Sequence, residues 1–142
     1  MKHIFALLLF VTFSAQASTQ SNNAADLDVS GTWWVYPANS TDSPEIVAGI
    51  VKLTQSGNYI EGVYALKSDE NASTKCSMGP YTVKGSVEGN TIYMTASSDV
   101  STLTGQVSGN VEKLDGQGTE VFTAPGCTGS NTSNFVMMKM PE

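Results

Sequence analysis

Very few side chains in this sequence have the chemistry of a catalytic or metal-binding group. The one histidine is His3, near the N-terminus, and the chain contains no arginine. A Ser-His-Asp or Cys-His couple and an imidazole metal site are therefore excluded beyond the first residues. The forked guanidinium contact with a carboxylate or phosphate is excluded as well. A pair of carboxylates could still do acid–base work, but no two acidic residues stand out from a solvated surface. We predict no enzyme, no catalytic residue and no cofactor.

A glycine-rich motif occurs three times, as GSVEGN at 85–90, GQVSGN at 105–110 and the partial copy QSGN at 55–58. Such stretches bind phosphate where a helix N-terminus follows them. No helical pattern follows any of the three copies. A Gly-Asn pair between two strands is typical of a two-residue hairpin turn, in which Gly suits type II′ and Asn tolerates type I′. We interpret the motif as a turn.

The N-terminal segment has the features of a secretory signal peptide. Lys2 precedes an apolar run over residues 4–13, and Ala15-Gln16-Ala17 forms a small-residue cleavage site. We expect a signal peptide at 1–17, a polar disordered leader at 18–28 and one folded domain at 29–142. No second apolar stretch reaches the roughly 20 residues of a membrane helix. The expected location is secreted or periplasmic, without membrane insertion.

The net charge is −6 for the whole chain, and the loss of Lys2 with the signal peptide makes it one unit more negative. An acidic exported protein repels nucleic acid, so we expect no nucleic-acid partner. Met137, Met138 and Met140 could favour a soft metal, but alternation along a strand divides them between two faces. We therefore assign them to packing and predict no metal site.

Cys76 and Cys127 are the two cysteines of the chain. In an exported protein such a pair is by default a disulfide. Free thiols or a two-thiolate metal site are alternatives, but the latter needs further ligands that the sequence does not show. We predict an intramolecular bond between Cys76 and Cys127.

Apolar and polar residues alternate over most of the mature chain, which predicts half-buried strands. In residues 81–88, for example, Tyr, Val, Gly and Val share one face, while Thr, Lys, Ser and Glu share the other. No segment shows an apolar stripe of helical period. The expected strands are 30–37, 46–55, 58–66, 80–88, 90–97, 101–108, 112–124 and 134–141.

The connections between these strands alternate between Gly-Asn turns and longer polar loops. In an up-and-down arrangement, alternate connections lie at opposite ends, so the turns gather at one end and the long loops at the other. Eight antiparallel strands close naturally into a barrel, which removes the sheet edges. The predicted fold is all-β, an eight-stranded antiparallel up-and-down β-barrel. A barrel of this size is filled by side chains or holds one small ligand.

Short motifs in the expected strand order resemble the avidin and streptavidin family. SGTWW at 30–34 is similar to the family's first strand, and IEGVY at 60–64 to its third. Residues 76–90 resemble the Cys-containing loop and fourth strand of dimeric bacterial avidins. LTGQ at 103–106 and GTEV at 118–121 continue the match in order. Lipocalins share the early Gly-x-Trp, so the wider calycin group is included in the resemblance.

The resemblance implies a pocket at the long-loop end, but the residues that hold biotin in the family are largely replaced. The family's Asn after the Gly-Thr-Trp-aromatic run is Val35 here, and its strand-three Ser is Leu66. Its three Trp positions fall at Ser98, Leu103 and Pro125. Lost hydrogen bonds cost about 1–3 kcal/mol each, and the Trp walls are lost as well. We therefore predict no tight biotin binding.

The expected function is a secreted, non-enzymatic barrel that binds a small apolar or amphipathic molecule. A second copy of the chain, in a homo-oligomer, is a further candidate partner. Alternatives are a protein–protein interaction or inhibitor module with a packed interior, weak or residual biotin binding, and, third, a carboxylate-dependent enzyme. In dimeric avidins the second cysteine lies in the loop between strands five and six, so the position of Cys127 differs from the family's. A disulfide between Cys76 and Cys127 would hold a loop across the opening of the pocket and limit the access of a ligand. The candidate ligand-binding residues are Val35, Asn39, Tyr64, Leu66, Asp99, Ser101 and Leu103.

Overall fold

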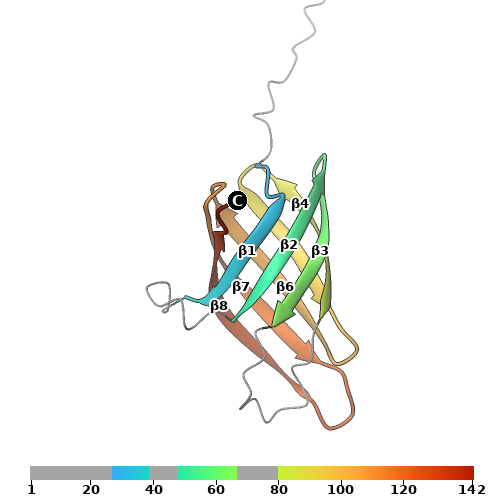
Figure 1. Cartoon of the computed structure of the whole chain (residues 1–142). Helices are drawn as coiled ribbons and strands as arrows, with labels where there is room; N and C mark the ends of the chain where they lie inside the picture. The colour runs from blue at the N-terminus through green and yellow to red at the C-terminus, as the bar shows by residue number, and fades with distance from the viewer. Residues whose placement is uncertain (1–26, 39–47, 67–79) are drawn as a thin grey trace, which may run out of the picture.

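Eight antiparallel strands, each paired with the next in sequence, form a barrel that closes between the first and the last (Figure 1). The structure is a computed structural model that describes residues 27–38, 48–66 and 80–142. None of these residues forms a helix long and apolar enough to cross a membrane. The predicted all-β barrel is confirmed. Its strands are β1 Gly31–Pro37, β2 Gly49–Ser56, β3 Tyr59–Leu66, β4 Tyr81–Glu88, β5 Thr91–Ser97, β6 Ser101–Gly109, β7 Lys113–Phe122 and β8 Gly129–Lys139.

The last strand differs most from its predicted bounds. β8 begins at Gly129 rather than at 134, and β7 ends at Phe122 rather than at 124. Residues 129–134 are all exposed, so they show no alternation of apolar and polar side chains. Their strand conformation comes from pairing with β7, which runs from Val121↔Ser130 to Gly118↔Ser133 and beyond. Alternation of buried and exposed side chains could not reveal this part of the strand, because only its backbone pairing with β7 defines it.

Two of the three Gly-Asn pairs form two-residue turns. Gly57 and Gly89 have φ of 61° and 63°, and no described residue other than glycine has a positive φ. A positive φ at the first central residue with a negative φ at the second fits type II′ and excludes type I′. The left-handed conformation explains the choice of Gly at both positions.

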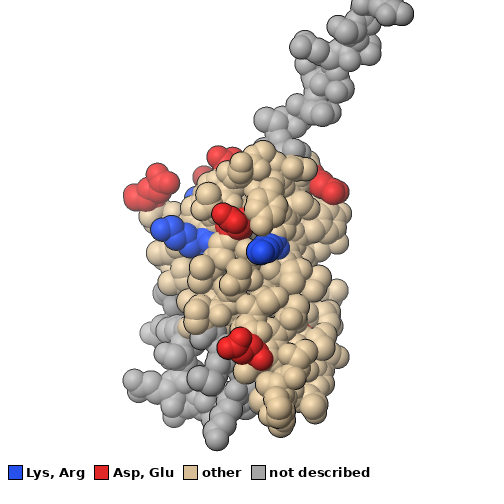
Figure 2. All heavy atoms as spheres, turned by 90° about the vertical axis from the view of Figure 1, so that its right-hand side faces the viewer, with Lys and Arg blue, Asp and Glu red and all other residues tan. Residues whose placement is uncertain are grey.

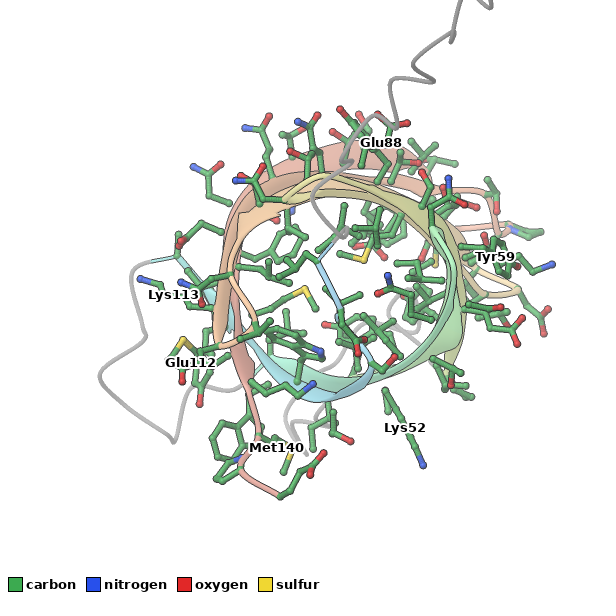
Figure 3. The ribbon with its side chains drawn as sticks, turned by 90° about the horizontal axis from the view of Figure 1, so that it is seen from above. Lys52, Tyr59, Glu88, Glu112, Lys113 and Met140 are labelled. Carbon is green, nitrogen blue, oxygen red and sulfur yellow. The ribbon has the colours of Figure 1, made fainter. Side chains whose placement is uncertain are left out.

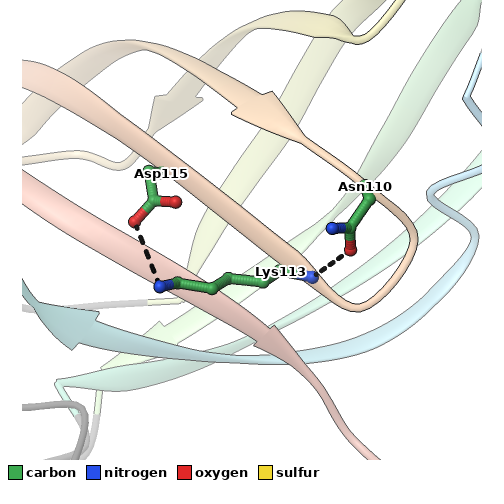
Figure 4. Close-up of polar contacts among 3 residues, drawn as sticks. All are labelled: Asn110, Lys113 and Asp115. Carbon is green, nitrogen blue, oxygen red and sulfur yellow. Dashed lines mark hydrogen bonds and ion pairs between the residues drawn. The ribbon is translucent and has the colours of Figure 1, made fainter.

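The third Gly-Asn pair does not form a two-residue turn, and its three-residue connection lies one residue later than the predicted strand bounds place it. Residues 110–112 separate β6 from β7, and the Asn110 side-chain oxygen accepts hydrogen bonds from the backbone N–H groups of Glu112 and Lys113, at 2.9 and 3.0 Å. Figure 4 shows this loop, with Lys113 also 3.9 Å from Asp115. Both charged side chains are exposed, so the ion pair adds little stability.

We call the end of the barrel with these three turns the turn end, and the opposite end, where β1, β3, β5 and β7 terminate, the loop end. Large apolar side chains pack the turn end. Trp33 is fully buried, and its indole N–H donates to the Val29 carbonyl oxygen at 2.9 Å. The Lys139 ammonium lies 5.0 Å from the centre of the Trp33 ring and donates to the Ser30 carbonyl oxygen. The interior therefore has a closed floor at this end.

Residues that precede β1 contact the turn end of the barrel. Leu27 packs against the core cluster, and its N–H donates to the carbonyl oxygen of Gly89 in the turn between β4 and β5. Val29 is fully buried, and its N–H donates to the Gln55 side-chain oxygen. Leu27 and Asp28, which the sequence placed in the leader, thus stand at the turn end of the folded domain.

The outer wall carries the second face of each strand. Trp34 is half-buried while its neighbour Trp33 is fully buried, as expected for adjacent strand residues. In the view along the barrel axis, Lys52, Tyr59 and Lys113 point away from the barrel (Figure 3). Charged side chains are sparse on the face shown in Figure 2. Charge thus plays little part in holding the wall together.

Candidate functional site

A cavity of about 240 Å³ lies inside the barrel, on the loop-end side of the packed floor. Its wall is mainly apolar and comes from seven of the eight strands, all except β7. Because side chains alternate along a strand, every second residue of these strands faces the interior. The apolar lining includes Val51, Val83, Met94, Ala96, Leu103 and Phe135.

Two glycines on neighbouring strands make room for the Phe135 ring. Gly105 on β6 and Gly118 on β7 are paired across the sheet. A methyl group added at Gly105 would lie 3.5 Å from the ring, and one added at Gly118 would lie 3.2 Å from it. The Phe135 ring therefore occupies space that side chains at Gly105 and Gly118 would restrict. The small residues on β6 and β7 keep the interior from being filled completely.

Tyr64 is one of the polar side chains of the cavity wall, together with Tyr36, Ser133 and Asn134. Its ring covers Gly49, where an added Cβ would come within 2.5 Å of Tyr64 Cε2, and it lies 5.8 Å from the Tyr81 ring, centre to centre. Burial raises the pKa of Tyr64 to about 12, with smaller contributions from Tyr81 and from the negative charge of Glu120. The hydroxyl thus stays protonated at neutral pH. The hydroxyl makes no hydrogen bond within the described residues. Its oxygen is not completely buried, so it is accessible from the cavity.

A polar cluster of three side chains stands beside the cavity, toward the loop end. Glu120 Oε1 accepts hydrogen bonds from the Ser101 hydroxyl at 2.7 Å and from the Tyr81 hydroxyl at 3.1 Å. The two hydroxyl oxygens are 3.0 Å apart. Ser101 is fully buried and Tyr81 nearly so. Burial, first of all, raises the pKa of Tyr81.

The turn between β5 and β6 holds Ser101 in place. The N–H of Ser101 donates to the Ser98 hydroxyl oxygen at 3.3 Å, and the N–H of Ser98 donates to the Ser101 carbonyl oxygen at 2.9 Å. Among the residues that the structure describes, no three metal-binding side chains come together. The cluster is thus a hydrogen-bonded group of side chains next to the cavity, and none of the three lines the cavity itself.

The structure brings together only some of the candidate ligand-binding residues. Val35, Tyr64 and Leu103 line the cavity. Leu66 packs against the core without lining the cavity, and Ser101 lies in the polar cluster. Asp99 is exposed in the turn between β5 and β6, so its carboxylate faces solvent rather than the cavity. The prediction for Asn39 falls outside the described residues.

Sequence reasoning missed Tyr81 and Glu120. The signal for Glu120 was present, because Leu114, Gly116, Gly118 and Glu120 share one face of β7 and Leu114 is fully buried. A carboxylate on the inward face of a strand in a barrel needs partners. Those partners come from β4 and β6, far away in the sequence, and no local pattern points to them.

Of the two cysteines, only Cys127 lies within the described residues. It is buried, it is not a free thiol, and its N–H donates to the Ala124 carbonyl oxygen at 2.9 Å. Its position after β7 puts it at the loop end. Cys76 lies outside the described residues, so the bond between Cys76 and Cys127 stays a prediction.

Comparison with known proteins gives structural neighbours but no sequence relative. No family model matches the chain, and no curated protein sequence matches it. The crystal structure of a rhizavidin–biotin complex superposes with a TM-score of 0.56 at 13% identity, covering 81% of this chain and 94% of the other. A crystal structure of rhizavidin gives a TM-score of 0.57 at 12% identity, covering 82% and 85%. The barrel inferred from the turn-rich motifs is confirmed: this chain has an avidin-like fold.

Proposed function

We propose that this chain is an exported, non-enzymatic barrel that binds one small, mainly apolar molecule in the cavity at its loop end. The observation that carries the proposal is the cavity of about 240 Å³ in the interior. It is larger than the roughly 150 Å³ cavity that holds benzene and smaller than the roughly 300 Å³ at which sites for drug-sized ligands begin. The ligand is therefore compact.

The composition of the wall supports a ligand with an apolar body and one polar group. Apolar side chains such as Met94, Leu103 and Phe135 surround most of the space. Tyr64 adds a hydroxyl that has no partner within the described residues. A bound molecule that accepts or donates one hydrogen bond there would satisfy this group without leaving a buried polar atom unpaired.

Two alternative functions, a protein–protein interaction module and a carboxylate-dependent enzyme, have less support. A solid interaction module would fill its interior to the density of a protein core, and the cavity argues against that. An enzyme built on paired carboxylates needs two acids in one cleft. Among the acidic residues that the structure describes, Glu120 alone faces the interior, while Glu61, Glu88 and Asp115 are exposed on the outer wall.

Native mass spectrometry of protein purified from its own host tests the proposal, and a matched pair of variants locates the ligand. Ala96→Phe places a ring in the cavity wall, whereas Ala65→Phe makes the same change on the exposed face of β3. We expect a small molecule to be retained by the wild type and by Ala65→Phe, and to be lost from Ala96→Phe. Equal retention by both variants would place the ligand elsewhere.

We expect this chain to bind biotin much more weakly than a typical member of the avidin family. Val35 and Leu103 line the cavity with apolar groups at two of the positions where the family resemblance implies an amide and an aromatic ring. Each unmatched hydrogen bond costs about 1–3 kcal/mol. We therefore expect calorimetry at micromolar protein to show weak biotin binding or none. A nanomolar Kd would contradict this prediction.

A further inference from the structure

We propose that Glu120 sets the charge class of the ligand: the cavity takes a compact apolar molecule that carries an amine, and it discriminates against carboxylates. This inference rests on the proposed function, because it concerns the same cavity. It adds a chemical class for the ligand's polar group and names the side chain that selects it.

The position of Glu120 follows from the strand register. Glu120 is paired with Leu103 across β6 and β7, and Leu103 lines the cavity. Gly118, two residues earlier, lies against the ring of Phe135 in the cavity wall. Since β7 runs toward the loop end, Glu120 stands one step further toward that end on the same inward face. Glu120 does not line the cavity itself, but its strand partner Leu103 does, so the carboxylate lies next to the cavity wall on the loop-end side.

The hydrogen bonds that Glu120 accepts from described residues all go to one carboxylate oxygen, Oε1. Oε1 accepts both the Ser101 and the Tyr81 hydroxyl, at 2.7 and 3.1 Å. Both donors are buried, and the backbone of the β5–β6 turn holds Ser101. Oε2 has no hydrogen-bond partner within the described residues. The carboxylate is thus fixed in orientation, and Oε2 remains an acceptor without a partner among the described residues, which is the arrangement needed to receive an N–H donor.

No described cation neutralises this carboxylate. The ion pair of the described residues joins Lys113 to Asp115 on the outer wall, and Lys139 lies over Trp33 at the turn end. The charge of Glu120 reaches the cavity wall, because it contributes to raising the pKa of Tyr64. An ammonium group in the cavity would gain a charge-assisted hydrogen bond, whereas a carboxylate would be desolvated beside a like charge.

The experiment measures the affinities of three probes that share one alkyl chain: hexylamine, hexanol and hexanoate. Calorimetry is run at neutral pH on the wild type, Glu120→Gln, Glu61→Gln and Ala96→Phe. Glu61→Gln removes the same charge from the exposed face of β3, so it controls for the net charge of the protein. Glu120→Asp keeps the charge and serves as a second test if Glu120→Gln does not fold.

We expect the wild type and Glu61→Gln to bind hexylamine at least about tenfold more tightly than hexanoate, since like charges at close range cost several kcal/mol. In Glu120→Gln the amine and the carboxylate should bind within about threefold of each other. Glu120→Asp should keep the preference for the amine. Hexanol should bind the wild type, Glu61→Gln, Glu120→Gln and Glu120→Asp with similar affinity. Ala96→Phe should bind none of the three probes.

The outcomes distinguish the inference from the proposed function. If all three probes bind the wild type equally, or if Glu120→Gln keeps the amine preference, Glu120 does not select the ligand, while the binding cavity stands. If no probe binds the wild type, the proposed function fails, and the inference fails with it.

Discussion

The two ends of the barrel use the same alternating strands but fill their interior differently. At the turn end, Trp33, Ile60 and Leu114 are all fully buried and close the floor. At the loop end, Ala96 and Gly118 take up little room, and a cavity of about 240 Å³ remains. Burial stabilises by about 25 cal/mol per Å² of apolar surface, but atoms that border an empty space lack partners on one side.

If the proposed function holds, packing and binding lie at opposite ends of one barrel. Most of the fully buried side chains among the described residues, such as Trp33, Ile92 and Val107, lie at the packed end, whereas the open end has small residues and an interior carboxylate. Each of the following predictions changes one end and compares it with the other, beginning with the largest expected effect on stability.

The predicted disulfide would give the open end a covalent source of stability in place of packing. A bond between Cys127 and Cys76 closes a ring of about 50 residues, for which chain entropy predicts about 4 kcal/mol. Urea denaturation with and without reductant should show a loss of that order. Non-reducing peptide mapping checks the pairing, and a Cys76–Cys76 bond between two chains would contradict it.

The same truncation should cost more at the packed end than at the open end. Leu114 is fully buried in the floor, whereas Leu103 is half-buried and borders the cavity. We expect Leu114→Ala to lower the free energy of unfolding by about 3 kcal/mol and Leu103→Ala by about 1 kcal/mol. Chemical denaturation measures both. Equal losses would show that the space beside Leu103 is closed.

An amide introduced at each end tests whether water reaches the cavity. Val107→Asn buries an unpaired amide among packed side chains and should cost about 1–3 kcal/mol, in addition to lost packing. Val35→Asn places the amide at the cavity wall, where water can satisfy it, so the cost should stay below about 1 kcal/mol. If the two variants lose the same stability, the loop end is as dry as the floor.

Alkaline pH should affect the open end through Tyr64. Its pKa is raised to about 12 by burial, from the ordinary value of 10, so the folded state keeps a proton that the unfolded state releases. This contribution to stability is present below pH 10 and is lost as the pH rises through about 12. In Tyr64→Phe the fall of stability over this range should be shallower, as measured by urea denaturation at each pH. Tyr59→Phe, on the exposed face of β3, should behave like the wild type.

Much of the fold could be predicted from the sequence because its causes are local. Alternating burial in β4, β5 and β6, and the Gly-Asn turns at Gly57 and Gly89, each depend on residues within one hairpin. The first half of β8 could not be predicted, since residues 129–134 are exposed on both faces and are held by backbone pairing with β7. The connection between β6 and β7 differs from the two-residue turns at Gly57 and Gly89, because the Asn110 side chain accepts hydrogen bonds from the backbone of Glu112 and Lys113.

The sequence by itself determined which residues face inward, because strand alternation is a local property. The family resemblance, rather than alternation, proposed Val35, Tyr64, Leu66 and Leu103 as wall residues, and all of these except Leu66 line the cavity. Only the tertiary structure decided that the interior stays open and that Glu120 meets Ser101 and Tyr81. Those partners lie 19 and 39 residues away in the sequence. Whether side chains fill a barrel depends on the summed volume of residues brought together by register across several strands, which no single segment contains.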